Sequence, residues 1–247
     1  MNKPNNITQN DWDLLKEKYP DLDKIKELID ANYPIQYLIG NVNFYGYKIN
    51  VNKNVLIPRF ETEGLVEKTI KLIQEKELNN SQVLEIGTGS GCISIALKKE
   101  IDTLHITSID ISKKALRVAK MNANENAVDI TFIHKSLYKF KPINRYSILI
   151  SNPPYVDINE TVDPKTKFEP QNAIFANDKG LEYYKYIINN YDKYMTKDFI
   201  MAFEIGCTQA TDLTNIAKTK YPNAIVKVEK DLAKLDRYLF IIQDSNN

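Results

Sequence analysis

The residues best suited to chemistry form the run Asn152-Pro153-Pro154-Tyr155, which is expected at the carboxyl end of a strand. Proline has no N–H and its ring fixes φ, so the two prolines leave their carbonyl oxygens free to accept hydrogen bonds. The side-chain oxygen of Asn152 is a further acceptor, and the Tyr155 ring offers a face against which a flat group can lie. The run therefore predicts a rigid set of acceptors for a planar –NH2 group, in preference to an ordinary Pro-Pro turn.

A second candidate is the glycine-rich run Glu85-Ile-Gly-Thr-Gly-Ser-Gly91. Its glycines allow a sharp turn and close approach of a ligand, and the helix expected behind them offers free N–H groups. The spacing departs from the dinucleotide fingerprint at Cys92, and the Gly-Lys-Ser/Thr of a phosphate-binding loop is absent. The alternative is a glycine turn that only packs.

Asp110 is expected at the end of the next strand, beside the same crevice. There its carboxylate can accept both hydrogen bonds of a ribose diol, whereas Ser112 can cap the helix that follows. A glycine loop and an acidic strand end, without a pyrophosphate site, favour S-adenosylmethionine over NAD. The predicted cofactor residues at these two places are Glu85, Gly87, Thr88, Gly89, Ser90, Gly91 and Asp110.

The helix expected to begin near Thr62, after Pro58, is a third candidate. A helix N-terminus attracts carboxylates, so Thr62 is a candidate to receive the carboxylate of the methionine moiety. A simple capped helix start is the alternative. His105 and His134 fall within apolar strand patterns and are expected to be structural, so no metal site is predicted.

The elements that must position these residues alternate between strand and helix from residue 81 onward. This alternation predicts an α/β fold with a seven-stranded, mostly parallel, Rossmann-like sheet, whose last two strands are candidates for an antiparallel hairpin. The predicted strands are 82–86, 104–110, 130–134, 146–151, 199–205, 224–229 and 238–242, and the predicted helices are 91–100, 112–125, 179–195 and 207–219.

The chain divides into three predicted parts. A short helical segment spans 1–41, a β-hairpin connector spans 42–58, and the domain that carries the chemistry spans 59–247. Within that domain the polar segment 156–178 shows no periodicity and contains two prolines. A loop of that length in a compact domain is either a wrongly assigned segment or a functional lid, and its position after Tyr155 favours the lid.

Composition excludes several classes of protein. The chain of 247 residues is 43% hydrophobic, enough for a large core, and its formal net charge is +1. A protein that holds a nucleic-acid backbone by charge alone is usually more basic. The two cysteines form neither a disulfide framework nor a zinc ribbon, and neither a signal peptide nor a membrane span is apparent. We therefore expect a cytoplasmic protein with no stable binding of nucleic acid or membrane.

The run EIGTGSG, the acidic end of the second strand and SNPPY together resemble the class I S-adenosylmethionine-dependent amino-methyltransferases. Members that carry NPPY modify planar nitrogens, either adenine N6 in DNA or the glutamine amide in proteins. Further segments resemble the release-factor glutamine methyltransferases, the PrmC/HemK family, over roughly residues 34–242. These segments are Pro34–Gly40 (PIQYLIG), Ile57–Glu63 (IPRFETE), Phe168–Pro170 (FEP) and Lys179–Leu181 (KGL).

The resemblance implies methylation of the side-chain amide nitrogen (N5) of the glutamine in the Gly-Gly-Gln motif of bacterial peptide chain release factors. It implies that Asn152, Pro153, Pro154 and Tyr155 are the catalytic residues and that they bind the substrate together with Phe60. It also implies that Leu137 and Asn152 contact the cofactor. The chain departs from the family pattern at Phe60, where proline is usual, and at Ser136-Leu137, where an acidic residue is usual.

Three alternatives remain at this stage. A DNA adenine methyltransferase would use the same acceptors for a flipped base. A ribosomal-protein glutamine methyltransferase is closer still, although the IPRFETE segment speaks against it. A catalytically silent binding module that keeps the adenosyl-ligand fold is the third alternative, and the intact run Asn152–Tyr155 argues against it.

Overall fold

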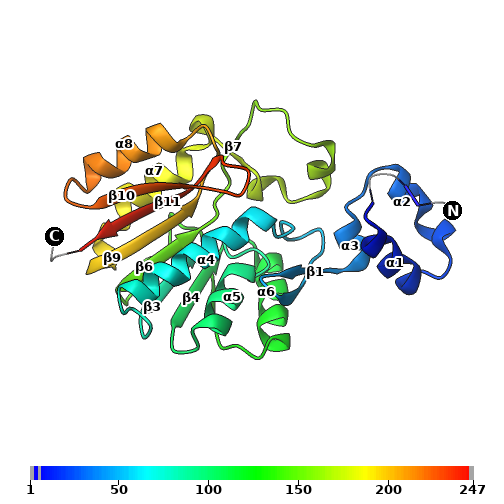
Figure 1. Ribbon diagram of the computed structural model, residues 1–247, viewed down its shortest axis with the longest axis horizontal. Coiled ribbons are helices and arrows are strands. Elements are labelled where there is room, and N and C mark those ends of the chain that lie inside the picture. The colour runs from blue at the N-terminus through cyan, green and yellow to red at the C-terminus, as the bar shows by residue number, and fades with distance from the viewer. Residues whose placement is uncertain (1–2, 5–6, 245–247) are drawn as a thin grey trace.

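The computed structural model describes residues 3–4 and 7–244, and its centre is a seven-stranded sheet in the order β10-β11-β9-β6-β3-β4-β5 (Figure 1). The strands from β5 to β9 pair in parallel, whereas β11 is antiparallel to both β9 and β10. The mostly parallel sheet and the final antiparallel hairpin are therefore confirmed. The strands are β3 (Gln82–Ile86), β4 (His105–Asp110), β5 (Thr131–His134), β6 (Tyr146–Ser151), β9 (Met195–Glu204), β10 (Ile225–Lys230) and β11 (Asp236–Gln243).

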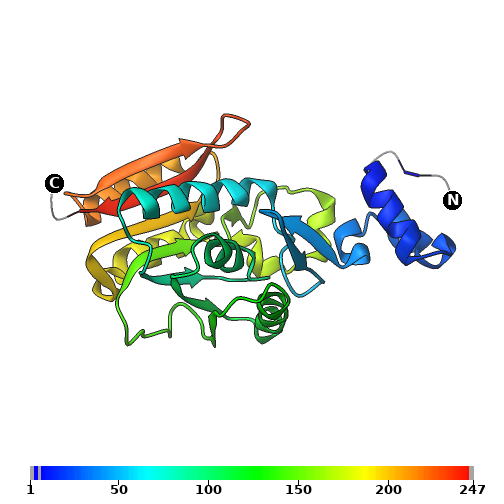
Figure 2. The ribbon, with the colours of Figure 1, turned by 60° about the horizontal axis from the view of Figure 1, so that its bottom comes forward.

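Helices cover both faces of this sheet (Figure 2). One face packs against α4 (Phe60–Glu75), α5 (Cys92–Glu100) and α6 (Lys113–Glu125), and the other against α7 (Glu182–Asn190) and α8 (Ala210–Lys220). Successive strand residues point to opposite faces, so Val83 joins the first apolar cluster and Leu84 the second. Because both faces are buried, the central strands are almost continuously apolar, as parallel sheets require.

The helix predicted over 179–195 is shorter than expected. It is α7 alone, with 3₁₀ turns η4 (Asp178–Gly180) and η5 (Asp192–Tyr194) at its two ends. Asp178, Lys179 and Gly180 all have positive φ, between 55° and 79°, which no α-helix accommodates. These three residues delay the start of the helix.

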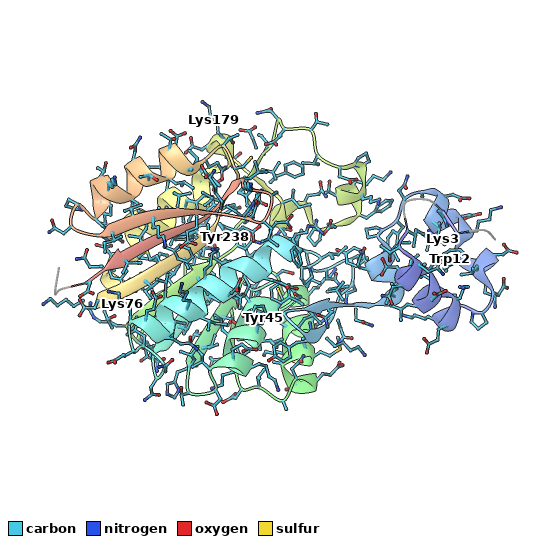
Figure 3. The ribbon with its side chains drawn as sticks, in the orientation of Figure 1. Lys3, Trp12, Tyr45, Lys76, Lys179 and Tyr238 are labelled. Atoms are coloured by element: carbon cyan, nitrogen blue, oxygen red, sulfur yellow. The ribbon has the colours of Figure 1, made fainter. Side chains whose placement is uncertain are left out.

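The N-terminal helices lie at one end of the molecule (Figure 1) and share a small core of their own. They are α1 (Gln9–Lys18), η1 (Leu22–Ile25), α2 (Lys26–Asp30) and α3 (Ile35–Ile39). Trp12, labelled in Figure 3, is 5% exposed within that core. The strands β1 (Asn41–Phe44) and β2 (Tyr47–Asn50) form the predicted hairpin. The division into 1–41, 42–58 and 59–247 stays a prediction.

The segment 156–178 is not the structureless loop that its sequence suggests. The strands β7 (Val156–Asp157) and β8 (Phe175–Ala176) pair in parallel at its two ends, and the 3₁₀ turns η2 (Pro164–Phe168) and η3 (Gln171–Ala173) lie between them. Such short elements leave no period in the sequence. The closing of this segment as a lid over the site stays a prediction. In the described part of the chain, no helix is long and apolar enough to span a membrane.

Candidate active site

The carboxyl ends of β3, β4 and β6 meet around a cavity of about 250 Å³. From β3 the chain passes to β4 on one side of the sheet, and β6 lies on the other, so the cavity opens where the strand order reverses. Open α/β sheets bind their ligands at this point. Of the residues predicted from the sequence, the cavity is lined by Gly87, Gly89, Asp110, Leu137, Asn152, Pro153 and Pro154.

The glycine loop divides into two functions. Gly87 and Gly89 have φ of 78° and 54°, and a Cβ built on either meets no atom within 4 Å. These two glycines open the cavity, because a side chain on either would extend into space that a ligand can occupy. Gly91 does not line the cavity. A Cβ there would lie 3.2 Å from the Ala119 Cβ, so this glycine allows α6 to pack against α5.

Asp110 joins the glycine loop to the turn that precedes α6. Its Oδ2 accepts a hydrogen bond from the Gly89 N–H at 2.9 Å, and its Oδ1 accepts one from the Ser112 N–H at 2.7 Å. Burial raises the pKa of the Asp110 carboxyl above its ordinary value. Ser112, as predicted, caps α6 by accepting from the Ala115 N–H. An ionised carboxylate has about four acceptor positions, so Asp110 keeps acceptor capacity for a ligand beyond the two bonds to Gly89 and Ser112.

Glu85, Thr88 and Ser90 lie beneath the loop and do not line the cavity. All three are at most 3% exposed, and the Thr88 hydroxyl donates to Glu85 Oε2 at 2.6 Å. Ser94 donates to the same oxygen, whereas Glu85 Oε1 is buried without a partner among the described residues. Burial raises the pKa of Glu85. The direct cofactor contact expected of these residues stays a prediction, and their position indicates support of the loop from below.

Asn152 follows β6 and is tied to α4. Its Nδ2 donates to Thr62 Oγ1 at 3.1 Å, and Thr62 Oγ1 donates in turn to Glu204 Oε2 at 2.6 Å. Tyr155 donates to the other oxygen of Glu204 at 3.3 Å. Glu204 ends β9, the strand next to β6, and is 1% exposed.

Three further predicted site residues, Thr62, Phe60 and Tyr155, do not line the cavity either. The helix predicted to begin at Thr62 begins at Phe60, so Thr62 is a buried residue of its first turn and not the residue before it. Phe60 is 66% exposed. Tyr155 packs against the apolar cluster on the α7 side of the sheet. The contacts expected of these three residues with cofactor or substrate stay predictions.

The cavity also has walls that the sequence did not indicate. Asn54, Val55 and Leu56, from the segment between β2 and α4, line it together with Asn172, Ala173 and Tyr183. The segment 54–56 falls within the predicted connector 42–58, because its sequence carries only the signal of a strand that ends. No signal in the sequence singled out Tyr183.

The segment 156–178 is anchored beside the cavity by a partly buried ion pair between Arg59 and Glu169. Arg59 Nη2 lies 2.6 Å from Glu169 Oε1, and Glu169 Oε2 accepts from the Ile57 N–H at 3.0 Å. The Glu169 side chain is 3% exposed and that of Arg59 is 35% exposed. Two of the segments that resemble the family, IPRFETE and FEP, therefore meet here.

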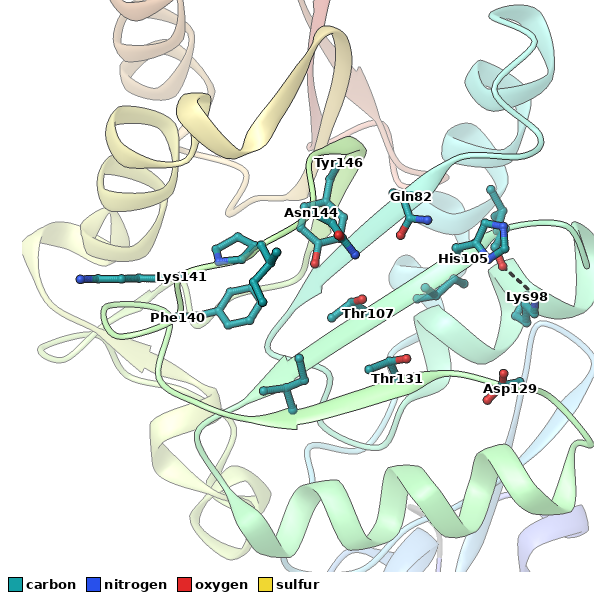
Figure 4. Close-up of a pocket in the computed structure, with 15 residues that line it drawn as sticks. Gln82, Lys98, His105, Thr107, Asp129, Thr131, Phe140, Lys141, Asn144 and Tyr146 are labelled. Carbon is teal, nitrogen blue, oxygen red and sulfur yellow. Dashed lines mark hydrogen bonds between the residues drawn. The ribbon is translucent and has the colours of Figure 1, made fainter.

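A larger hollow, of about 440 Å³, lies at the opposite edge of the sheet (Figure 4). It is bounded by the amino ends of β3, β4 and β6, where Lys98 donates to the Leu104 carbonyl at 2.7 Å. Neither the glycine loop nor the Asn152 run reaches it. The described residues contain no group of His, Cys, Asp and Glu able to hold a metal.

The fold and the cavity define a Rossmann-like, S-adenosylmethionine-dependent methyltransferase. Residues 65–168 match the family model of the methyltransferase small domain. A methyltransferase from Pyrococcus furiosus has the same fold, with a TM-score of 0.61 at 11% identity, over 96% of this chain and 99% of that one.

Sequence comparison identifies the family. The chain is 37% identical to a release factor glutamine methyltransferase of Enterococcus faecalis, over 84% of this chain and 75% of that protein. It is 33% identical to the release factor glutamine methyltransferase of Lactococcus lactis, over 92% of this chain and 86% of that protein. The chain belongs to the release factor glutamine methyltransferase family.

Proposed function

We propose that this protein methylates the side-chain amide nitrogen of the glutamine in the Gly-Gly-Gln motif of bacterial peptide chain release factors. The observation that carries the proposal is that Gly87, Gly89 and Asp110 share one cavity with Asn152 and Pro153. An adenosyl site and a set of acceptors for a planar nitrogen therefore face the same space. The names of the relatives supply the identity of the protein substrate.

The cofactor half of the cavity suits an adenosyl group without phosphates. The open space over Gly87 and Gly89 lets the ligand approach the backbone, and the free acceptor positions of Asp110 suit the two hydroxyls of a ribose. Leu137 provides an apolar wall. S-adenosylmethionine, when bound, supplies a methyl group on a positively charged sulfur.

The acceptor half suits a glutamine amide. The Asn152 amide presents its NH2 to Thr62, which leaves Oδ1 to accept an N–H from the substrate, and the Pro153 carbonyl can accept the second N–H. An amide nitrogen is a weak nucleophile because its lone pair is delocalised into the carbonyl. Two fixed acceptors orient the nitrogen and stabilise the positive charge that develops on it during transfer. The proton can leave afterwards, so no strong base is required before attack.

Incubation with radiolabelled S-adenosylmethionine and an acceptor tests the proposal. We expect label on a release factor that carries Gly-Gly-Gln and none on its Gly-Gly-Ala counterpart, which differs only at the methyl acceptor. Duplex DNA and total ribosomal protein are the comparison acceptors. Label on either of these, with none on the Gly-Gly-Gln protein, would overturn the assignment.

A further inference from the structure

A chain of hydrogen bonds connects a buried carboxylate to the residue that receives the substrate. Glu204 accepts from Thr62 Oγ1 at 2.6 Å, and the same Thr62 oxygen accepts from Asn152 Nδ2 at 3.1 Å. The three residues come from the end of β9, the first turn of α4 and the residue after β6. Ser151 pairs with Phe203 in the sheet, which places Glu204 and Asn152 at neighbouring strand ends.

Which group donates and which accepts in each of these bonds follows from the protons that the three side chains carry. An ionised carboxylate only accepts hydrogen bonds, so the single hydroxyl proton of Thr62 is directed to Glu204. The Thr62 oxygen can then only accept from Asn152, and the Asn152 amide must present its NH2 group to it. Oδ1 of that amide, for its part, makes no hydrogen bond within the described chain and belongs to a residue that lines the cavity.

The orientation of the Asn152 amide matters for substrate binding, because the two ends of an asparagine amide have almost the same shape but opposite hydrogen-bonding character. With Oδ1 toward the cavity, Asn152 accepts an N–H of the substrate amide. With the amide rotated by 180°, an NH2 group would face the NH2 group of the substrate, and no hydrogen bond could form. Packing alone does not distinguish the two orientations of the Asn152 amide, whereas the hydrogen bond to Thr62 does.

We propose that Glu204 is a positioning residue which, through the Thr62 hydroxyl, holds the Asn152 amide with its oxygen toward the substrate nitrogen. This proposal rests on the function proposed above. It also gives Thr62 a role other than the predicted contact with the cofactor. Glu204 is 1% exposed and does not line the cavity, so it acts through the direction in which the Thr62 hydroxyl proton points.

The protonation state of Glu204 then controls the amide. Burial raises the pKa of Glu204, whereas the bond from Thr62, the charge of Arg237 and the bond from Tyr155 lower it. A protonated Glu204 can donate to Thr62, whose own proton would then turn to Asn152 and favour the rotated amide. We therefore expect kcat to fall on the acid side, as pH drops through the raised pKa. The titratable groups whose charges act on or are affected by Glu204 are Glu61, Cys92, Tyr155, Tyr184, Arg237 and Tyr238.

Two substitutions at Thr62 separate positioning from packing. Thr62→Val keeps the shape and removes the hydroxyl, and Thr62→Ser keeps the hydroxyl and removes a methyl group. Loss of one hydrogen bond of about 1.4 kcal/mol corresponds to about a tenfold fall in kcat for Thr62→Val, with KM for the release factor and cofactor affinity little changed. Thr62→Ser should keep kcat close to that of the unmodified protein, because its hydroxyl can still make the hydrogen bonds to Glu204 and Asn152. Thr62→Ser as impaired as Thr62→Val, or Thr62→Val with normal kcat, would overturn the proposal.

A second measurement is independent of any methyl acceptor. In ¹⁵N-labelled protein, the side-chain NH2 signal of Asn152, assigned by its loss in Asn152→Asp, should shift as pH drops. We expect that shift to persist in Thr62→Ser and to disappear in both Thr62→Val and Glu204→Gln. The same signal and the same absence of titration in all four proteins would overturn the positioning role. An unmodified protein that shows this titration but does not label release factors would instead refute only the proposed substrate.

Discussion

Replacement of Asp110 by alanine tests whether this carboxylate holds the cofactor or only the turn around it. Both oxygens already bind backbone, at Gly89 and Ser112, so the substitution has two separable effects. Two backbone N–H groups lose their acceptor, which should lower the free energy of unfolding by about 1–3 kcal/mol. Any effect on the cofactor comes in addition, through the acceptor capacity of the carboxylate that the backbone leaves free.

The magnitude for the cofactor follows from the charge of the acceptor. Hydrogen bonds to a charged group contribute about 1.5–3 kcal/mol. A net loss of about 2–3 kcal/mol corresponds to about 30- to 150-fold weaker binding of S-adenosylmethionine. Titration calorimetry measures this directly, and a thermal melt without ligand measures the structural effect.

Ser112→Ala is the matched control for this experiment. It removes the cap of α6 at the same turn, at a cost of about 1 kcal/mol in stability, and leaves the Asp110 carboxylate in place. The loss of cofactor affinity in Ser112→Ala should be smaller than the loss in Asp110→Ala by an order of magnitude. Equal losses of affinity in the two variants, or a destabilised Asp110→Ala with unchanged affinity, would refute a direct role for the carboxylate.

Three further predictions concern the same cavity. Gly89→Ala should weaken cofactor binding in calorimetry, because its Cβ enters the open cavity. Gly91→Ala should mainly lower the melting temperature, because its Cβ presses on α6. The reverse pattern would contradict the division of the loop into two functions. Glu169→Gln should speed hydrogen exchange over 156–178, because the ion pair with Arg59 that anchors the segment is lost; unchanged exchange would show that other contacts hold it. Asn152→Ala should lower the single-turnover rate of methylation by about 10²- to 10³-fold with little change in substrate binding. A variant that melts at a lower temperature but methylates at the normal rate would show that Asn152 only stabilises a turn.

The sheet was predictable because its signals are local. Each central strand is a short apolar run bounded by polar or glycine residues, and the rule that parallel strands end at one edge then brings the glycine loop, Asp110 and Asn152 together. The predictions failed where backbone conformation overrides composition. The positive φ of Lys179 and Gly180 delays α7, although the side chains that follow continue a helical pattern.

The polar contacts that support the site were not predictable from periodicity. Thr62 and Glu204 are 142 positions apart, and Arg59 and Glu169 are 110 apart. A sequence pattern reports whether a residue is buried, but the choice of partner for a buried polar group depends on which elements the fold places side by side. From the sequence, Glu204 is therefore only a residue of the predicted strand 199–205, and Thr62 only the predicted start of a helix.

The run Asn152–Tyr155 is held at its far end as well. A Cβ on Gly180 would lie 1.9 Å from the Tyr155 carbonyl oxygen, and the Gln209 Nε2 donates to that oxygen at 2.9 Å. The prolines fix φ within the run, Thr62 fixes the asparagine before them, and the contacts of Gly180 and Gln209 fix the tyrosine after them. A weakly nucleophilic amide gains little from acceptors that must first be ordered, because the cost of ordering would offset the stabilisation of charge in the transition state. The turn before α7, which delays the predicted helix, therefore contributes to keeping these acceptors in place, together with Thr62 and Gln209.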